Sequence, residues 1–201
     1  MKSILCLVSI VFLIDQIQVA AASVNSREGA FEWLDKYGYN PCSGAAVQCS
    51  SDLGSILKEF QRRFGLKVTG ELDSSTIRQM NKPRCGVQDK LKLKSGGPME
   101  LSAYKWTRSS LKYSIHAYPT QISQAATRSI IREAFQAWTN HVPLQIEETC
   151  STCQSDFVLD FASGLHTDSF PFDGVGGTLA HAFFPEDGRV HFDKDESWTE
   201  R

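Results

Sequence analysis

The sequence predicts an α+β protein built in two parts: a small bundle of three helices, then a mixed sheet with one long helix packed against it. Apolar residues recur at helical spacing in three short segments before residue 85, and strand-like segments surround one long amphipathic segment after residue 105. The 201 residues are enough for two small domains, and 41% hydrophobic with 22% charged residues favours a packed core. The net charge of −2 gives no electrostatic reason to expect nucleic acid as a partner.

Residues 1–22 have the pattern of a secretory signal peptide. Lys2 gives a short positive start, Ile4 to Ile14 is an almost unbroken apolar run, and small residues follow from Ala20 to Ala22. The alternative is a membrane anchor, but a bilayer span takes roughly 20 apolar residues and this run is shorter. We therefore expect secretion to the extracellular space or matrix, and no membrane span in the rest of the chain.

Residues 24–89 are predicted to form the helical bundle. The segments Glu28 to Tyr37, Asp52 to Phe64 and Ser74 to Met80 have helical spacing of apolar residues. Ser51 is a candidate N-cap for the second helix and Asp73 for the third.

Residues 90–104 are predicted to be a linker between the two parts, because they show little periodicity and contain a Ser-Gly-Gly-Pro turn sequence. Lys90, Lys92 and Lys94 serve either solubility or cleavage by a trypsin-like protease. The linker has no paired basic residues, so cleavage by an intracellular furin-like enzyme is not expected.

Residues 105–201 are predicted to form the sheet part. The helix is expected over Gln124 to Asn140, with an apolar face that includes Ile130, Ile131 and Phe135. Strands are expected at Leu111 to His116, Leu144 to Ile146, Phe157 to Phe161, Thr178 to Phe184 and Arg189 to Phe192.

The cysteines suggest two local disulfides and one thiol left over. Cys6 leaves with the signal peptide, and the secreted chain keeps Cys42, Cys49, Cys85, Cys150 and Cys153. Pairing Cys42 with Cys49 and Cys150 with Cys153 leaves Cys85 over in an oxidising compartment. The Cys150–Cys153 pair could also remain as two thiols, but a zinc ribbon is not expected because there is no second CxxC.

Three of the five histidines fall near one another in the sequence, as His166-Thr-Asp168, His181 and His191. Zinc takes four ligands from imidazole, thiolate and carboxylate groups. Three histidines and one aspartate would fill all four positions and leave none for water, which is typical of a structural zinc site. The alternative is a set of ordinary surface or core histidines.

Carboxylates lie between and after these histidines. A glycine-rich turn runs from Asp173 to Thr178, and Asp193 and Glu196 follow the last histidine. Calcium takes six to eight oxygens from such mixtures of carboxylates and backbone carbonyls. The alternative is a polar loop with a solvated acidic run.

Cys85 lies in the sequence Pro83-Arg84-Cys85-Gly86-Val87-Gln88-Asp89, where the bundle ends. A thiolate is a strong zinc ligand, and one that filled the open position of a catalytic zinc would exclude the attacking water. The alternative is a cysteine in a turn, either free or paired with another chain.

Several of these segments resemble those of a known protein family. Residues 83–86 followed by Asp89 resemble the cysteine switch of the matrix metalloproteinases, and residues 24–85 resemble that family's peptidoglycan-binding-like prodomain. Residues 172–183 and 191–199 resemble the metal-binding half of its catalytic domain, which belongs to the metzincins. The likeness covers nearly all of the chain after the signal peptide.

The resemblance implies a set of site residues. Cys85 would bind the catalytic zinc of the zymogen, and Leu179 and Ala180 would bind an extended peptide substrate along an edge strand. The structural zinc would take His166, Asp168, His181 and His191. Calcium ligands would be Asp173, Gly174, Gly176, Thr178, Asp193 and Glu196, with Asp156 binding a second calcium.

The resemblance also implies a secreted, latent zinc endopeptidase that cleaves extracellular matrix proteins and binds protease inhibitors of the tissue-inhibitor type. The chain departs from the family at Gln88, where proline is usual, and in the short segment 184–189. Its 201 residues contain no His-Glu-x-x-His sequence, which the family uses for catalytic zinc. We therefore expect a fragment that is itself inactive; the alternatives are a truncated non-catalytic decoy or a metal-binding secreted protein.

Overall fold

The computed structural model describes residues 23–42, 52–90 and 104–200, which fall into two compact units. The helical unit takes its described residues from Ala22–Lys82 and Val87–Met99, and the sheet unit from Pro83–Gly86 and Glu100–Arg201. The expected signal peptide, Cys49 and most of the expected linker lie outside the described residues. Across the described ranges, no helix has the length and apolar character needed to cross a membrane.

The helical unit contains the three predicted helices, α1 (Arg27–Lys36), α2 (Leu53–Arg63) and α3 (Ser74–Met80). The N-cap of α3 is Asp73, as predicted. For α2 the cap is Asp52 and not Ser51, because the Asp52 carboxylate accepts the backbone N–H groups of Gly54 and Ser55. The core of the unit is lined by Ala30, Leu34, Tyr37, Tyr39, Ile56, Leu57, Phe60 and Met80.

One buried polar side chain fixes the turn between α2 and α3. Gln61 Nε2 donates to the Thr76 hydroxyl at 2.9 Å and to the Glu71 carbonyl at 3.0 Å. Gln61 Oε1 accepts the N–H groups of Thr69 and Gly70, each at 2.9 Å. The side chain is fully buried and uses both its donor and its acceptor, so its burial does not leave a polar group unsatisfied.

The sheet unit holds a six-stranded mixed sheet with the strand order β1-β5-β6-β4-β2-β3. Strands β5 and β6 pair antiparallel, and all the other neighbours pair parallel. The strands are β1 (Arg84–Cys85), β2 (Ser110–Ile115), β3 (Gln145–Glu148), β4 (Phe157–Ala162), β5 (Thr178–Ala182) and β6 (Arg189–Asp193). The sequence did not predict β1, because two residues are too few for a periodic signal.

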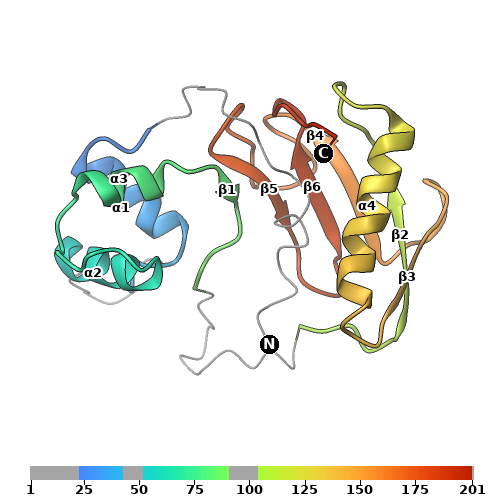
Figure 1. Ribbon diagram of the computed structural model, residues 1–201, viewed down its shortest axis with the longest axis horizontal. Coiled ribbons are helices and arrows are strands. Elements are labelled where there is room, and N and C mark those ends of the chain that lie inside the picture. Colours follow the sequence, from blue (N-terminus) through green and yellow to red (C-terminus); the bar gives the residue numbers. More distant parts are fainter. Residues whose placement is uncertain (1–22, 43–51, 91–103, 201) are drawn as a thin grey trace. The chain divides into compact units, whose positions relative to one another are not determined.

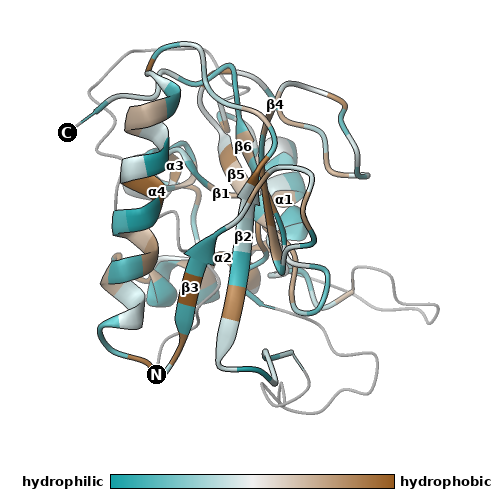
Figure 2. Cartoon of the chain, turned by 90° about the vertical axis from the view of Figure 1, so that its right-hand side faces the viewer, coloured by the Kyte–Doolittle hydropathy of each residue, from teal (hydrophilic) through white to brown (hydrophobic). Residues whose placement is uncertain are grey.

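Helix α4 (Gln124–Thr139) packs on one face of the sheet through Thr127, Ile130, Ile131 and Phe135. The Phe135 ring lies 4.7 Å from the Tyr113 ring of β2 and 5.5 Å from the Phe157 ring of β4, measured between centroids. Figure 2 shows hydrophobic and hydrophilic residues alternating along this helix and along β2 and β3, as expected for elements with one covered face.

Candidate metal centre and sheet edge

The four residues predicted to bind structural zinc come together in the sheet unit. His181 lies in β5 and His191 in β6, and the two are directly opposite each other in the antiparallel register. His166 and Asp168 come from the connection between β4 and β5. The four zinc residues therefore come from two strands and one loop. Their spacing in the sequence suggests a shared site, and the fold is what brings them together.

Four donor atoms converge: Nε2 of His166, Nε2 of His181, Nδ1 of His191 and Oδ2 of Asp168. The aspartate oxygen lies 2.7 Å from His191 Nδ1 and 2.9 Å from His181 Nε2. His181 Nε2 lies 3.1 Å from His191 Nδ1 and 3.3 Å from His166 Nε2. Ligands around a tetrahedral zinc with bonds of about 2.0–2.1 Å lie roughly 3.3 Å from one another. Zinc therefore fits with only a small expansion of the donor set.

The electrostatics of the site also suit a metal. Burial lowers the pKa of His181 and of His191, against the opposing effect of Asp168, so both imidazoles are neutral at neutral pH. Burial raises the pKa of Asp168, but hydrogen bonds from the Phe170 N–H and His181 outweigh it, and the pKa falls to about 2. His181, His191 and Asp168 thus have the protonation states that zinc requires of its ligands.

A backbone contact orients one ligand. His166 Nδ1 donates to the Gly164 carbonyl at 2.8 Å, which leaves its Nε2 with the lone pair directed at the other three donors. The side chains of His166, Asp168, His181 and His191 are between 2% and 8% exposed, so bulk water has little access to the site.

A second acidic cluster lies at the end of β6. Asp193 and Glu196 are buried, and Glu196 Oε1 accepts the Gly176 N–H at 2.6 Å. Burial, reinforced by the negative charges of Asp193 and Asp173, raises the pKa of Glu196 to about 7. Asp193 Oδ2 is buried and has no hydrogen-bond partner among the described residues. Such a carboxylate is costly to bury without a cation, so the cluster fits calcium.

The two clusters differ in how their ligands meet. Within the described ranges, the donor atoms of the four zinc residues converge on one point. The calcium residues do not converge in that sense, but calcium also takes backbone carbonyls and water. Which carbonyls of Gly174, Gly176 and Thr178 would serve stays a prediction.

Asp156, the predicted ligand of a second calcium, lies apart from this cluster at the start of β4. Its carboxylate forms an ion pair with Arg108 and accepts the Lys112 N–H at 2.7 Å. A calcium role for Asp156 is a prediction that these contacts do not favour.

Strand β1 covers the free edge of β5, the strand predicted to bind substrate through Leu179 and Ala180. The Arg84 N–H donates to the Gly177 carbonyl and the Gly86 N–H to the Ala180 carbonyl, both at 2.8 Å. A Cβ at Gly86 would lie 2.7 Å from Thr178 Cγ2, so glycine is needed for this close approach. The sequence around Cys85 is therefore held as an added strand at this edge.

The expectation that Cys85 is left over is corrected by the structure, in which Cys85 is disulfide-bonded, as are Cys42, Cys150 and Cys153. The prediction counted the cysteines that remain after removal of the signal peptide, an odd number. Cys6 and Cys49 lie outside the described residues, and none of the described cysteines is free.

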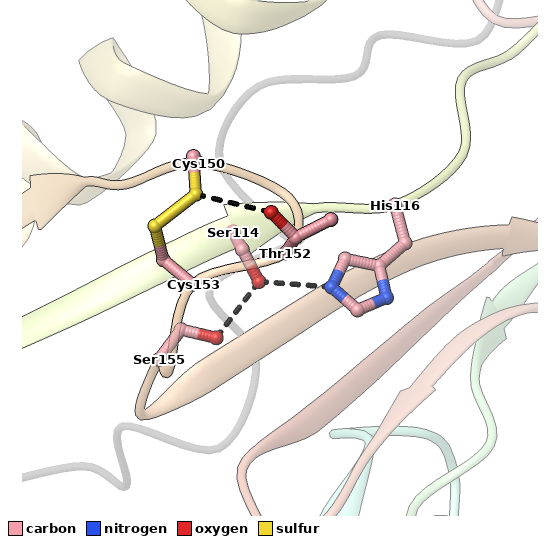
Figure 3. Close-up of a disulfide and its surroundings, with 6 residues drawn as sticks. All are labelled: Ser114, His116, Cys150, Thr152, Cys153 and Ser155. Carbon is pink, nitrogen blue, oxygen red and sulfur yellow. Dashed lines mark hydrogen bonds between the residues drawn. A yellow bond between two sulfur atoms is a disulfide. The ribbon is translucent and has the colours of Figure 1, made fainter.

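The predicted Cys150–Cys153 disulfide is present, and its Cα atoms lie 5.1 Å apart. It closes the connection between β3 and β4, which lie on opposite sides of β2. Figure 3 shows this loop over β2, where the Ser155 hydroxyl lies 2.7 Å from the Ser114 hydroxyl. Ser114 Oγ also lies 3.2 Å from His116 Nε2. The disulfide therefore tightens a loop that crosses the sheet.

Comparison with known families gives two matches. Residues 105–201 match the model of the family described as Matrixin, and residues 30–80 match that of a peptidoglycan binding domain. The chain is 38% identical to human matrix metalloproteinase-16 over 94% of its own length and 34% of that protein. It is 38% identical to mouse matrix metalloproteinase-25 over 84% of the chain and 30% of that protein.

A nematode protein shows the same likeness. The chain is 37% identical to matrix metalloproteinase-C of Caenorhabditis elegans over 87% of its own length and 31% of that protein. It thus spans about a third of the length of the relatives it matches.

Proposed function

This chain belongs to the matrixin family of matrix metalloproteinases, and from that premise we propose that it is part of a secreted, latent zinc endopeptidase that cleaves extracellular matrix proteins. The observation that carries the proposal is the edge of β5, which accepts an extended segment of the same chain through the Gly177 and Ala180 carbonyls. An extended peptide substrate would use the same edge by strand addition. Inhibitors of the tissue-inhibitor type are proposed to compete for it.

Latency in this proposal comes from occupation of that edge. While β1 hydrogen-bonds to β5, a substrate strand cannot reach the Ala180 carbonyl, so β1 has to leave before cleavage begins. Because β1 contains only two residues, its pairing with β5 contributes little stability by itself. The chain connects β1 directly to the helices that precede it, and this connection keeps the local concentration of β1 high. Removal of the helical unit would therefore release the edge.

Metals have two proposed roles. His166, Asp168, His181 and His191 hold a structural zinc, and Asp173, Asp193 and Glu196 contribute to a calcium site. A catalytic zinc would act as a Lewis acid and activate water. The three-histidine helix that binds it in the family is not in these 201 residues, so no catalytic step is assigned to them.

Cys85 remains a predicted ligand of the catalytic zinc. Only a thiolate binds zinc, so the disulfide of Cys85 has to be absent from the zymogen for this role. Thiol alkylation and mass spectrometry of the secreted protein under non-reducing conditions test the point. The switch role requires alkylated Cys85, and Cys85 found only in a disulfide, as in this structure, contradicts it.

The experiment that tests the proposed activity begins with the transcript beyond the codon for Arg201. A reading frame that continues into a His-Glu-x-x-His helix is expected, and the protein encoded by it should cleave an extended peptide once the helical unit is removed. Loss of cleavage with a zinc chelator and its return with zinc complete the test. A protein with this helix that cleaves no peptide under these conditions refutes the proposal.

A second candidate function applies to a product that ends at Arg201. It would keep the β5 edge and the structural zinc set without the catalytic one, which favours a non-catalytic decoy or metal-binding secreted protein. A stop codon after Arg201 in abundant transcript would make this the function to test.

A further inference from the structure

Asp156 has its hydrogen-bonding groups satisfied by this chain. Its Oδ1 pairs with the Arg108 guanidinium, and its Oδ2 accepts the Lys112 N–H at 2.7 Å. The Asp156 N–H donates in turn to the Lys112 carbonyl at 2.8 Å. With the side chain 11% exposed, little of the carboxylate is left for another ligand.

The third oxygen of Asp156, its backbone carbonyl oxygen, is covered by the turn between β5 and β6. Gly188 has a φ of +69°, and a Cβ on it would lie 1.9 Å from the Asp156 carbonyl oxygen. The Gly188 carbonyl accepts the Val158 N–H at 3.2 Å, which holds the turn against the start of β4. The backbone of this short turn therefore lies where a calcium ion would have to approach the carbonyl.

The same turn contains an arginine that pairs with a carboxylate of the turn. Arg189 donates from Nε to Asp187 Oδ1 at 2.7 Å and from a terminal nitrogen to Asp187 Oδ2 at 2.8 Å. The guanidinium also lies 4.3 Å from the centroid of the Phe183 ring. Hydrogen bonds from Arg189 hold the pKa of Asp187 below its usual range, so this carboxylate is also ionised and neutralised within the chain.

The carboxylates at the end of β6, unlike Asp156 and Asp187, have no arginine beside them in the described part of the chain. Asp193 is fully buried with one carboxylate oxygen unpartnered among the described residues. Glu196 is 3% exposed, and its carboxylate accepts the backbone N–H of Gly176. No ion pair in the described part of the chain neutralises either group.

We propose that the sheet unit binds a single calcium ion, at the Asp193–Glu196 cluster. Where a second calcium was expected, Arg108 neutralises Asp156, and Arg189 neutralises Asp187 in the adjoining turn. Arginine forms fixed, bidentate contacts with carboxylates and is always charged, so it can serve as a permanent counterion. The calcium site itself is taken from the proposed function, whereas the assignment of Asp156 rests on its own contacts. This end of the sheet should then be insensitive to calcium.

The test counts metal ions on the secreted chain. After dialysis into calcium-free buffer, equilibrium dialysis with radioactive calcium gives the number of bound ions, and atomic emission gives the zinc content of the same sample. One calcium per chain is expected. Glu196→Gln should lose it, whereas Asp156→Asn, the matched control, should keep it.

Two calcium ions on the wild-type chain, or a count that Asp156→Asn lowers, would overturn the inference. The wild-type count decides the matter even where the Asp156→Asn chain does not fold. Zinc content is a separate readout: a chain with one calcium and no zinc contradicts the proposed metalloprotein and still supports this assignment.

A stability measurement tests the role of the arginine. In calcium-saturated buffer, Arg108→Gln should lower Tm by several degrees, because it leaves the Asp156 carboxylate without its cation. Arg132→Gln is the control, since Arg132 is as exposed as Arg108 but Glu148, 3.9 Å away, also pairs with Arg128. Equal Tm values for Arg108→Gln and the wild type would also overturn the inference.

Discussion

At the residue scale, the metal sites depend on where individual donor atoms point. His181 and His191 alternate with core residues along β5 and β6, and their direct pairing in register brings Nε2 and Nδ1 within 3.1 Å. Asp168 reaches both from a loop. The site is therefore a property of strand register, and a shift by one residue would move each histidine to the other face of the sheet.

Loss of one zinc ligand should abolish zinc binding. His191→Ala removes a donor that is buried in β6, and three donors hold zinc more weakly than four. We expect zinc content after dialysis to fall from one ion per chain to almost none, measured by atomic emission. His141→Ala serves as the control, because His141 is exposed and not part of the converging set. Retention of full zinc by His191→Ala would show that the ligand set is wrong.

Glu196 gives the sheet unit a pH dependence that calcium should remove. Burial raises the pKa of Glu196 to about 7 in the folded chain, above the ordinary value of 4.5. A raised pKa means that stability is present below the unfolded value and is lost as pH rises through the folded value. In calcium-free buffer, Tm should therefore fall between about pH 4.5 and pH 7.

The same titration with calcium distinguishes the cause. Bound calcium favours the ionised carboxylate, so the fall in Tm should shrink or disappear. Glu196→Gln should show no such fall with or without calcium. An unchanged pH profile in the Gln variant would mean that another group titrates.

At the element scale, strand β1 depends on one glycine. Gly86→Ala would place a Cβ 2.7 Å from Thr178 Cγ2 and should open the pairing with β5. Loss of one hydrogen bond is worth about 1 kcal/mol, so the residue 86 amide should exchange about fivefold faster. Hydrogen exchange followed by mass spectrometry measures this, and Gly29→Ala is the control because its nearest contact, at 3.4 Å, is ordinary. Unchanged exchange at residue 86 would contradict the role of β1.

Helix α3 should lose its cap in acid. The Ser75 hydroxyl and the Thr76 N–H donate to Asp73 and hold the pKa of that carboxyl well below its usual range. The depressed pKa gives stability at neutral pH that is lost as pH falls below about 4. Asp73→Ala should cost about 1 kcal/mol at pH 7, whereas Asp73→Asn should cap nearly as well.

Urea unfolding of the helical unit at pH 7 and pH 3 measures this effect. The difference between the two pH values should be smaller in Asp73→Asn than in the wild type. A difference of the same size in both chains would assign the acid sensitivity to other carboxylates.

At the scale of the whole molecule, the described residues form two hydrophobic cores that share no residues. The aromatic and aliphatic residues of α1 and α2 pack in one, and the sheet residues with α4 pack in the other. Every predicted metal residue lies in the sheet unit. Metal removal should therefore lower the unfolding temperature of the sheet unit and leave that of the helical unit nearly unchanged.

Differential scanning calorimetry with and without chelator tests this separation. Two transitions are expected, and only one should move when metal is removed. Equal shifts of both transitions would mean that the two units unfold together.

The elements of this protein could be predicted from the sequence because each has a local signal. The predicted helices agree with α1, α2, α3 and α4 within about one residue. N-cap residues such as Asp73 and the spacing of apolar residues are short-range signals, so they can be recognised in the sequence. Strands β2 to β6 were also predicted, although the expected strand at 178–184 ends earlier, at Ala182. The zinc set was proposed from the histidine spacing and then from the family resemblance.

Sequence by itself determined which residues could bind metals and which segments could form strands, because side-chain chemistry and periodicity are local properties. Only the tertiary structure decided that β1 lies against β5 and that Asp156 is neutralised by Arg108. It also decided that one oxygen of Asp193 has no hydrogen-bond partner among the described residues. These features depend on contacts between residues far apart in the chain. Strand register and the packing of the whole unit set such contacts, and no local pattern encodes them.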